Sequence, residues 1–495
     1  MRSIKPIFYF LIISLSTLVN AQEWSQIGDD LNGEASLDYF GYKVSLSADG
    51  STLAVGGYQN DGSGTDAGHV RVFQNNTGTW TQIGNDIDGE TAQDHSSRAL
   101  SLSADGNIVA IGAMYNNGNG TNSGHVRIFE NMAGVWTQIG DDIDGENAND
   151  FSGYSVSLSG DGTIVAIGSV GSSANGANSG QVRIFKNLAG NWTQVGTNIN
   201  GEAAGDHSGY SVSISADGTI VAIGAYKNAG NGIKSGHVRV YQNNAGTWTQ
   251  IGDDIDGEAA NDYSGVAVSL SADGSIVAIG AYGNDGSFTE AGHVRVYQND
   301  TGTWTQIGDD IDGEATNDLS GTAVSLNSEG NILAIGARAN GGNGANSGHV
   351  RIYQNNAGIW SQKGEDIDGE ATDDLSGSGL SLSSNGLIVA IGAPGNDANG
   401  TASGHVRVFG HESLGIDTIL NPVFSIYPNP SNSIITIEDA VGFSITISDS
   451  TGRIIKKIEN KENKLTFDIS NQTTGIYYLS FKKNELVIHQ KVIKN

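Results

Sequence analysis

An acidic segment that recurs along the chain carries residue types that bind hard cations. One copy reads Asp141-Asp142-Ile143-Asp144-Gly145-Glu146 and is followed by Asp150. Ca²⁺ takes several oxygen ligands, and closely spaced carboxylates can supply them. The spacing differs from that of an EF-hand loop, which needs a glutamate twelve residues along. Two interpretations stand side by side: Ca²⁺ binding, or Asx turns on a solvated acidic rim.

The calcium interpretation assigns ligands in three copies of this segment. Ca²⁺ is then the cofactor, and its ligands are Asp142, Asp144, Glu146, Asp150, Asp254, Asp256, Glu258, Asp262, Asp310, Asp312, Glu314 and Asp318. The copy at residues 197–206 reads Thr-Asn-Ile-Asn-Gly-Glu-Ala-Ala-Gly-Asp and has lost three acids. This loss argues against an ion that every copy needs.

Histidine recurs in a second motif, Gly-His-Val. Six of the ten histidines occupy it, and the seventh copy has Gln181: the six are His69, His125, His237, His293, His349 and His405. On an alternating strand each histidine shares a face with an arginine two residues on, such as His237 and Arg239. A metal site needs convergent ligands, whereas these histidines lie in separate units. We therefore expect them to serve packing.

Catalytic residues should differ between the repeats, because a single active site needs one set of residues that the other repeats lack. The positions that vary are Tyr58, Met114, Val170, Tyr226, Tyr282, Arg338 and Pro394, together with His95, Arg98, Lys227 and Lys234. They form no recognisable nucleophile and base, phosphate loop or zinc signature. We expect no enzyme. The variation fits sequence drift as well as a binding surface, for which the candidates are Tyr58, Met114, Tyr226, Tyr282 and Arg338.

The elements that position these residues follow from a long repeat. All seven tryptophans are spaced by 56 residues, at Trp24, Trp80, Trp136, Trp192, Trp248, Trp304 and Trp360. A period near 50 with several short strands per unit is typical of a β-propeller. In the unit that begins at Trp248, alternating or continuous apolar runs predict four strands, at residues 266–271, 276–281, 293–298 and 304–307.

The connections predict how the strands pair. A tight turn at Ala272-Asp273-Gly274 joins the first two strands, and a hairpin at residues 299–302 joins the last two. Tyr297 should then lie near Trp304 as a cross-strand aromatic pair. Both long connections fall at the opposite end, so one face of the propeller carries every long loop.

The phase of the repeat predicts how the ring closes. The chain begins on a fourth strand at residues 23–27, and the last unit ends on a third strand at residues 405–409. The N-terminal strand should therefore complete the last blade. The fold class is all-β, a seven-bladed propeller over residues 22–410 followed by a small Ig-like β-sandwich.

The units resemble FG-GAP repeats, the propeller repeats of integrin α-subunits and many bacterial surface proteins. Phe40-Gly41 and Gly392-Ala393-Pro394 carry the resemblance, with weaker forms at Ser152-Gly153 and Gly224-Ala225. It implies a seven-bladed propeller used in adhesion or ligand binding. The calcium loop of the family lies between the first two strands. Here that connection is a tight turn with one acid, such as Asp161, so this calcium site is not carried over.

The C-terminal segment, residues 424–495 after a linker at 411–423, has a different pattern. Alternating runs at residues 434–437, 444–448, 465–469 and 476–481 predict a small β-sandwich. The segment resembles the C-terminal sorting domain of the Bacteroidetes type IX secretion system; the matching residues are Tyr427, Pro428, Asn429, Pro430, Gly452, Gly475 and Lys494. The resemblance implies the secretion machinery as a partner and a secreted or surface-attached product of a Gram-negative cell. An ordinary adhesive β-domain is the alternative.

Composition sets the remaining limits. Residues 1–21 read as a signal peptide, with an uncleaved anchor as the alternative, and no later segment is expected to span a membrane. Residues 22–416 hold 14 Lys and Arg against 46 Asp and Glu, which disfavours nucleic acid as a partner. The favoured function is a binding or adhesion module for an extracellular protein or glycan. A polysaccharide-active enzyme with its site at the propeller mouth and a structural surface-layer component are the alternatives.

Overall fold

The computed structural model describes residues 24–411 and, with short gaps, residues 425–494. The predicted signal peptide and most of the predicted linker lie outside the described residues. Within the described residues every regular element is a β-strand. No helix among them is long and apolar enough to cross a bilayer.

Each of seven sheets contains four main strands and one short strand, all antiparallel. The inner strands are β3 (Phe40–Leu46), β8 (Ala99–Leu102), β13 (Ser152–Leu158), β18 (Ser211–Ile214), β23 (Ala267–Leu270), β28 (Ser320–Leu326) and β33 (Gly379–Leu382). The second strands are β4 (Thr52–Gly57), β9 (Ile108–Ala113), β14 (Ile164–Ser169), β19 (Ile220–Ala225), β24 (Ile276–Ala281), β29 (Ile332–Ala337) and β34 (Ile388–Ala393).

The outer half of each sheet is equally regular. The third strands are β5 (His69–Asn76), β10 (His125–Met132), β15 (Gln181–Leu188), β20 (His237–Asn244), β25 (His293–Asp300), β30 (His349–Asn356) and β35 (His405–His411). The fourth strands are β6 (Thr79–Gln82), β11 (Val135–Gln138), β16 (Asn191–Gln194), β21 (Thr247–Gln250), β26 (Thr303–Gln306), β31 (Ile359–Gln362) and β1 (Trp24–Gln26). The short strands are β7 (Ile87–Asp88), β12 (Ile143–Asp144), β17 (Ile199–Asn200), β22 (Ile255–Asp256), β27 (Ile311–Asp312), β32 (Ile367–Asp368) and β2 (Leu31–Asn32).

The second strands form the core of the blades. In β24 all residues but the first are buried, because both faces of the sheet are covered by neighbouring blades. The four strands predicted for this unit are confirmed, with bounds that shift by at most two residues. The short fifth strand was not predicted. Two residues of the acidic segment pair with the third strand of their own blade, as Ile311 does with Val294.

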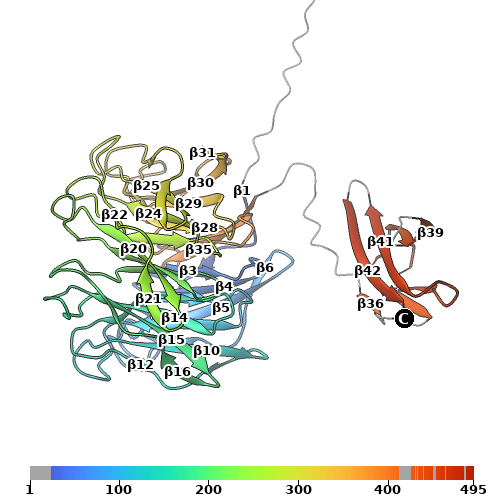
Figure 1. The fold of residues 1–495 in the computed structure, drawn as a ribbon, viewed down its shortest axis with the longest axis horizontal. Helices are drawn as coiled ribbons and strands as arrows, with labels where there is room; N and C mark the ends of the chain where they lie inside the picture. Colours follow the sequence, from blue (N-terminus) through green and yellow to red (C-terminus); the bar gives the residue numbers. More distant parts are fainter. Residues whose placement is uncertain are drawn as a thin grey trace, which may run out of the picture.

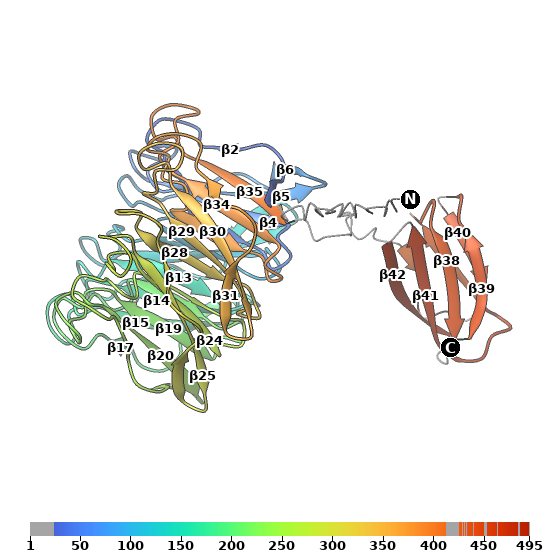
Figure 2. The ribbon, with the colours of Figure 1, turned by 90° about the horizontal axis from the view of Figure 1, so that it is seen from above.

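The ring closes through the N-terminal strand, as predicted. β1 pairs with β35, and the register places Trp24 opposite His411 and Gln26 opposite Phe409. Figures 1 and 2 show β1 and β2, at the blue end of the chain, beside the orange strands of the last blade. Two segments at opposite ends of the repeat region thus share one sheet, which removes the open edges that an unclosed ring would leave.

Two rings of hydrogen bonds hold the inner strands together near the tight turns. In the first, a serine side chain of each inner strand accepts the backbone N–H of the next blade at 2.9–3.1 Å; the serines are Ser45, Ser101, Ser157, Ser213, Ser269, Ser325 and Ser381. In the second, backbone N–H groups donate to carbonyls of the neighbouring turn at 2.7–3.0 Å, through Ala48, Ala104, Gly160, Ala216, Ala272, Ser328 and Ser384. The second ring returns to its starting residue, so it encircles the central channel at this end.

The tryptophans link neighbouring blades. Trp304 Nε1 donates to the carbonyl of Ile251 in the preceding blade at 2.9 Å, and all seven tryptophans make the equivalent bond at 2.8–3.0 Å. The predicted pairing of Trp304 with Tyr297 is corrected by the register, which places Trp304 opposite Asn299 and Tyr297 opposite Gln306. Both rings still pack against one apolar cluster.

The C-terminal residues form the predicted sandwich of two sheets. One sheet has the order β36 (Ser425–Tyr427), β37 (Ile434–Glu438), β40 (Lys464–Asp468); the other has the order β39 (Ile454–Glu459), β38 (Ser444–Asp449), β41 (Gly475–Lys483), β42 (Leu486–Lys494). Their shared core includes Ile435 and Phe467 from the first sheet and Ile445 and Phe481 from the second. β36, β39 and β42 were not predicted.

Candidate ligand-binding site

The central channel contains a cavity of about 180 Å³ lined by all seven inner strands or the residues just before them. Among the lining positions, one differs strongly from blade to blade. In chain order the residues are Tyr42, Arg98, Tyr154, Tyr210, Val266, Thr322 and Ser378. Four neighbouring blades therefore present large aromatic or cationic side chains, and the other three present small ones. Here the sevenfold symmetry of the backbone is broken by its side chains.

Aromatic rings continue from the channel to the long-loop face in two runs. In the first run, the centroid of Tyr58 lies 4.8–5.5 Å from those of Tyr42, Tyr39 and His95, and the run continues from His95 through Tyr115 to Phe151 at 4.9–5.7 Å. In the second, the centroid of Tyr226 lies 4.0–6.0 Å from those of Tyr210, His207 and Tyr263, and the run extends to Tyr154 at 4.9 Å from Tyr210 and to Tyr282 at 5.1 Å from Tyr263. These distances are typical of packed aromatic pairs. Blades six and seven have no aromatic residue at the matching places, where Leu319, Arg338 and Thr322 stand in blade six and Leu375, Pro394 and Ser378 in blade seven.

Arg98 joins the two runs. Its guanidinium carbon lies 4.7 Å from the ring centroid of Tyr42, 5.5 Å from that of Tyr58 and 5.7 Å from that of Tyr154. Cations within about 6 Å of a ring centroid are attracted by the ring quadrupole. Lys43 stands on the adjacent inner strand and also faces the channel, so two cations share this side of the cavity.

The protein environment shifts the pKa of several of these groups. Burial and the nearby Arg98 lower the pKa of the Lys43 amine, while the adjacent Tyr42 opposes them. Burial raises the pKa of Tyr58 and of Tyr282 to about 12, with neighbouring tyrosines adding to the effect. Burial lowers the pKa of His95 and His207. The tyrosines and these histidines are therefore neutral near pH 7, and the lasting charge comes from arginine and lysine.

Backbone strain occurs immediately before Arg98. Ser97 has a φ of 77°, in the left-handed region that L side chains rarely adopt. The other six blades have glycine at this place, such as Gly153 with a φ of 82°. The Ser97 hydroxyl is also buried without a hydrogen-bond partner. Residues held in such conformations cost about 1–3 kcal/mol and cluster at functional sites.

Four of the five predicted binding residues lie at this mouth. Tyr58, Tyr226, Tyr282 and Arg338 are half-buried and occupy equivalent places after the second strands. Met114 is only 5% exposed, so it is corrected to a supporting position beneath the surface. The prediction missed Tyr42, Tyr154 and Tyr210, although aligning the chain at its 56-residue period reveals their variable position as clearly as that of Tyr58.

The acidic segments do not bring their four carboxylates to one point. Asp142 accepts from Gln138 at 2.7 Å and faces His125, and Glu146 accepts from side chains of the next blade. Asp150 accepts the backbone N–H of Asn147, three residues earlier, at 2.8 Å and so fixes the loop between them. Asp144 is part of β12. The predicted sets at Asp254, Asp256, Glu258 and Asp262 and at Asp310, Asp312, Glu314 and Asp318 are arranged in the same way. These residues therefore do not fit the shared cage that Ca²⁺ requires.

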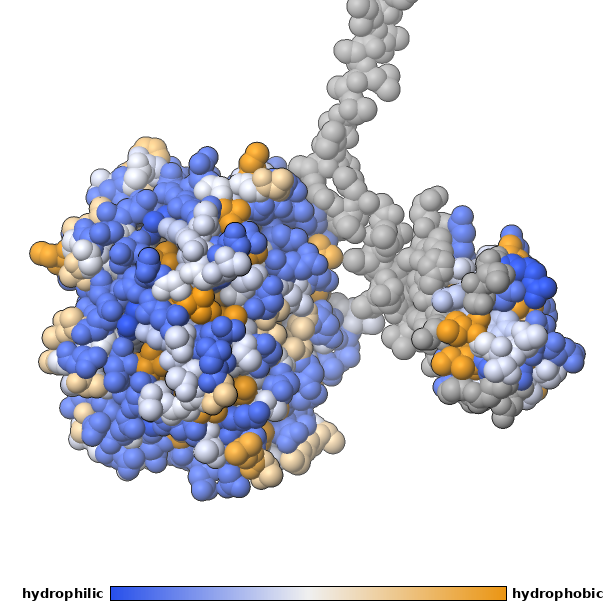
Figure 3. Space-filling view, viewed as in Figure 1, coloured by the Kyte–Doolittle hydropathy of each residue, from blue (hydrophilic) through white to orange (hydrophobic). Residues whose placement is uncertain are grey.

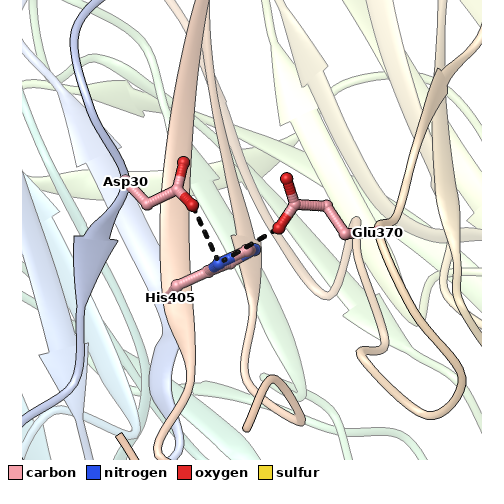
Figure 4. A group of neighbouring side chains, drawn as sticks. All are labelled: Asp30, Glu370 and His405. Atoms are coloured by element: carbon pink, nitrogen blue, oxygen red, sulfur yellow. Dashed lines mark ion pairs between the residues drawn. The ribbon is translucent and has the colours of Figure 1, made fainter. Parts of the chain in front are cut away.

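The histidines do have convergent neighbours, which corrects the expectation that they lack them. Each lies with one aspartate and one glutamate whose ligand atoms fall within 4.8 Å of one another. Figure 4 shows the copy at the ring closure, where His405 Nδ1 lies 3.8 Å from Asp30 Oδ2 and 3.9 Å from Glu370 Oε2. In five other copies the Nδ1 to aspartate distance is 3.3–3.5 Å.

A charge network explains these clusters without an ion. In six blades the glutamate also faces an arginine at 3.4–3.7 Å, as Glu258 faces Arg295. The arginine NH2 donates to a backbone carbonyl 39 residues earlier. The histidine contact lowers the pKa of the aspartates, among them Asp142, Asp254 and Asp310. Burial raises the pKa of the next aspartates, Asp144, Asp256 and Asp312.

The third blade replaces this cluster with neutral residues. Gln181 and Asn198 stand where the other blades have histidine and aspartate. Asn198 Nδ2 donates to Gln181 Oε1 at 3.0 Å, and both side chains donate to Glu146 at 2.8–3.0 Å. The two replacements occur together and keep the contacts between blades, so the cluster acts as a hydrogen-bonded clip.

The tight turns contain no cluster of acids. Asp161 Oδ1 accepts from the Ser159 hydroxyl and from the backbone and hydroxyl of Thr163, at 2.7–2.9 Å. Asn385 accepts the equivalent bonds in the last blade. In six blades one side chain at this place staples the turn, and it is an amide in the last of them. In the sixth blade Asn327 Oδ1 accepts the backbone N–H groups of Asn331 and Ile332 instead.

The predicted sorting residues lie in the C-terminal sandwich where they are described. Tyr427 donates to Glu438 at 2.8 Å, and Asn429 Oδ1 accepts the backbone N–H of Ile493 at 2.9 Å. Gly475 and Lys494 are paired across β41 and β42. Pro428, Pro430 and Gly452 lie outside the described residues.

Comparison with known proteins finds two families. Residues 425–495 match the secretion system C-terminal sorting domain, and residues 199–241 match the FG-GAP repeat. No curated protein matches the chain in sequence.

Three similar solved structures have low sequence identity. A Bacteroides uniformis protein assigned as a 6-phosphogluconolactonase is 13% identical, with a TM-score of 0.48 over 67% of this chain and 86% of its own. PorZ, a surface component of the type IX secretion system of Porphyromonas gingivalis, is 15% identical, with a TM-score of 0.42 over 94% of this chain and 60% of its own. The Dos1 propeller is 12% identical, with a TM-score of 0.42 over 79% and 95%.

The sorting domain implies engagement with the type IX secretion machinery and a product that is secreted or attached to the outer surface of a Bacteroidetes cell. The chain therefore carries FG-GAP repeats in a seven-bladed propeller and a C-terminal sorting domain of the type IX secretion system.

Proposed function

We propose that the protein is an extracellular binding or adhesion module, and that its ligand binds at the mouth of the central channel on the long-loop face. The observation that carries this proposal is the confinement of large, irregular side chains to this place. Elsewhere the blades repeat the same clips and staples, whereas the channel position runs from Tyr42 to Ser378 with seven residues of five types. Variable side chains on a rigid, repeated frame are typical of a binding surface.

The mouth has the physical properties of a ligand site. It is concave and rich in aromatic rings, and its polar lining includes two cations, Lys43 and Arg98, together with serine and threonine hydroxyls. Figure 3 shows a face of the propeller that is mainly hydrophilic, with apolar residues in small separate patches, and this favours a confined site over a broad apolar docking surface.

Binding is a better-supported function than turnover. Catalysis by general acid and base needs titratable groups within reach of the substrate. Asp94 is buried near His95, but its carboxylate already accepts hydrogen bonds from Thr91 and Asn116. These bonds give it a structural role rather than a catalytic one. The neutral tyrosines and the lone cations of the mouth suit recognition.

The test is equilibrium binding by the full secreted chain to immobilised glucan, mannan, polygalacturonate and gelatin. We expect micromolar or tighter binding to at least one polymer and no release of new chain ends. Tyr58→Ala and Tyr282→Ala should weaken that binding at least about tenfold, whereas Ile359→Ala, an exposed residue on an outer strand, should not change it. Equal binding by all variants would overturn the proposal, and so would polymer cleavage without stable binding.

A further inference from the structure

The positive charges of the propeller are divided into two sets with different surroundings. Seven of its 14 Lys and Arg are the arginines that recur on the third strands. Six of these arginines face a glutamate within 4 Å. Of the other seven cations, five lie at the channel or its mouth: Lys43, Arg98, Lys227, Lys234 and Arg338.

The five cations of the mouth have no carboxylate partner within 4 Å among the residues that the structure describes. They stand against tyrosine rings instead. Lys227 Nζ lies 5.0 Å from the ring centroid of Tyr226, and Lys234 Nζ lies 5.7 Å from that of Tyr263. Arg338 is close enough to Tyr282 to oppose the rise of its pKa. In a chain with a net charge of −29, unpaired cations gathered at one place are unexpected from composition alone.

One pair of cations lies in the channel itself. Lys43 and Arg98 face the same cavity from adjacent strands and repel each other. Arg98 Nε is buried and has no hydrogen-bond partner. Two like charges in a partly desolvated site cost free energy until an anion joins them. Arginine is suited to a carboxylate, because its planar group can donate two parallel hydrogen bonds.

The aromatic runs add a second requirement. Flat rings beside the cations favour a ligand that presents apolar faces together with its charge, as the C–H faces of a pyranose do. The cavity of about 180 Å³ is smaller than the pockets of about 300–1,000 Å³ that enclose drug-sized ligands. It therefore suits a single ring, while the rest of a chain would lie across the mouth.

Resting on the proposed function, we infer that the ligand is an acidic polysaccharide, with the carboxylate of one uronic acid unit held by Arg98 and Lys43 in the channel. Neighbouring sugar rings then stack on Tyr58, Tyr226 and Tyr282. Lys227, Lys234 and Arg338 pair with further carboxylates along the chain. The acidic body of the propeller repels the polymer elsewhere, which confines it to the mouth.

The test compares polygalacturonate with its fully methyl-esterified form, in binding assays with the full secreted chain. The two polymers share sugar rings and differ in charge. We expect the ester to bind at least about tenfold more weakly, and binding of the acid to weaken as salt rises. Lys43→Gln with Arg98→Gln should abolish binding to the acid. Lys227→Gln with Lys234→Gln, at the rim where folding is not at risk, should weaken it at least about tenfold.

A matched control removes the same charge elsewhere. Lys186→Gln with Lys363→Gln changes two cations outside the mouth and should leave binding to the acid unchanged. Equal binding of both polymers, with loss in Tyr58→Ala, would overturn the carboxylate assignment and leave the proposed function standing. Tighter binding of polyglutamate than of polygalacturonate would overturn the assignment of the ligand as a polysaccharide. If neither form of the polymer binds while gelatin does, the inference fails and the binding function survives.

Discussion

At the scale of single residues, the molecule uses one set of side chains seven times and another set once. The repeated set clips blades together, through a tryptophan indole and an arginine in each unit and a histidine in six of the seven. The single set includes Arg98, Lys43 and the tyrosines around them. The distinction matters because a residue that recurs in the blades can be explained by the contacts between them. A residue that occurs once at the channel does not have that structural role.

The histidine clip predicts strong coupling between His125 and Asp142. His125→Gln alone removes the imidazole that faces Asp142 and Glu90, and Asp142→Asn alone removes the carboxylate charge that faces the imidazole. The double variant, His125→Gln with Asp142→Asn, reproduces the arrangement of Gln181 and Asn198 in the third blade. We expect each single change to destabilise the protein by about 1–3 kcal/mol and the double change to recover most of it, with a coupling energy of about 0.5–3 kcal/mol.

Urea denaturation of the four proteins measures this coupling. Additive losses in the double variant would show that the two residues act independently, and the clip would then be rejected. The same four proteins also test whether the histidine clusters hold a metal ion. If Zn²⁺ raised the melting temperature of the wild type and not of the variants, the clusters would hold an ion.

Strain at Ser97 gives a second prediction. Ser97→Gly restores the residue of the other six blades, relieves the left-handed backbone and removes a buried hydroxyl without a partner. We expect a gain in stability of about 1 kcal/mol, because the substitution removes a conformational penalty. Binding at the mouth should weaken, because the glycine gives the backbone next to Arg98 more freedom and Arg98 is held less firmly. A variant that is no more stable by calorimetry would show that the backbone bears no strain there.

At the scale of elements, the tight turns depend on one acceptor side chain each. Burial raises the pKa of Asp49, Asp105, Asp161, Asp217 and Asp273, but hydrogen bonds from serine or threonine and the backbone outweigh it, and the pKa is lowered. A lowered pKa in the folded state means that the contribution to stability is present above the unfolded pKa of about 4 and is lost as pH falls through the folded value.

Replacing these five aspartates by asparagine tests that sign. Asn385 makes the same bonds in the last blade, so the variant should fold. Its melting temperature should lie below that of the wild type near neutral pH. As pH falls below about 4 the wild type should lose stability more steeply than the variant, which has no turn carboxylates to protonate, so that the two melting temperatures converge. Parallel melting curves over this range would contradict the account of the turns.

Much of this element level was predictable from the sequence. Tryptophan spacing gives the blade number, the Asp-Gly turns give the strand pairing, and the phase gives the closure of β1 on β35. The fifth strand was missed because two residues such as Ile311 and Asp312 carry no periodicity. The register of Trp304 was missed because hairpin length alone does not determine which residues lie opposite.

The candidate site was predicted less completely, for a physical reason. Tyr58, Tyr226 and Tyr282 were found because they vary at a position outside any strand. Tyr42 and Arg98 adjoin strands whose pattern is otherwise regular, and only the closed ring shows that they face a common cavity. The histidines were placed in separate units correctly, but the carboxylates that meet them come from connections 35 residues before and 17 residues after, which sequence spacing does not bring together.

At the scale of the whole molecule, the propeller and the C-terminal sandwich have separate roles. The sandwich at residues 425–494 carries the sorting signal, and the ring of seven blades carries a frame that is closed by its own N-terminal strand. The two hydrogen-bonded rings make one end of the channel regular and rigid. The other end, with every long loop, carries the side chains that differ. A rigid frame of this kind lowers the entropic cost of binding, because its contact residues are already in place.

Hydrogen exchange of the full secreted chain, with and without polygalacturonate, shows where a ligand binds and so tests whether the mouth of the channel is the binding site. We expect added protection at residues 39–44, 95–100, 151–156 and 207–212, which lead into the inner strands at the mouth. We expect no change at the tight turns of residues 47–51 and 271–275. Protection at the turns or on the outer strands, with none at the mouth, would contradict this assignment of the site.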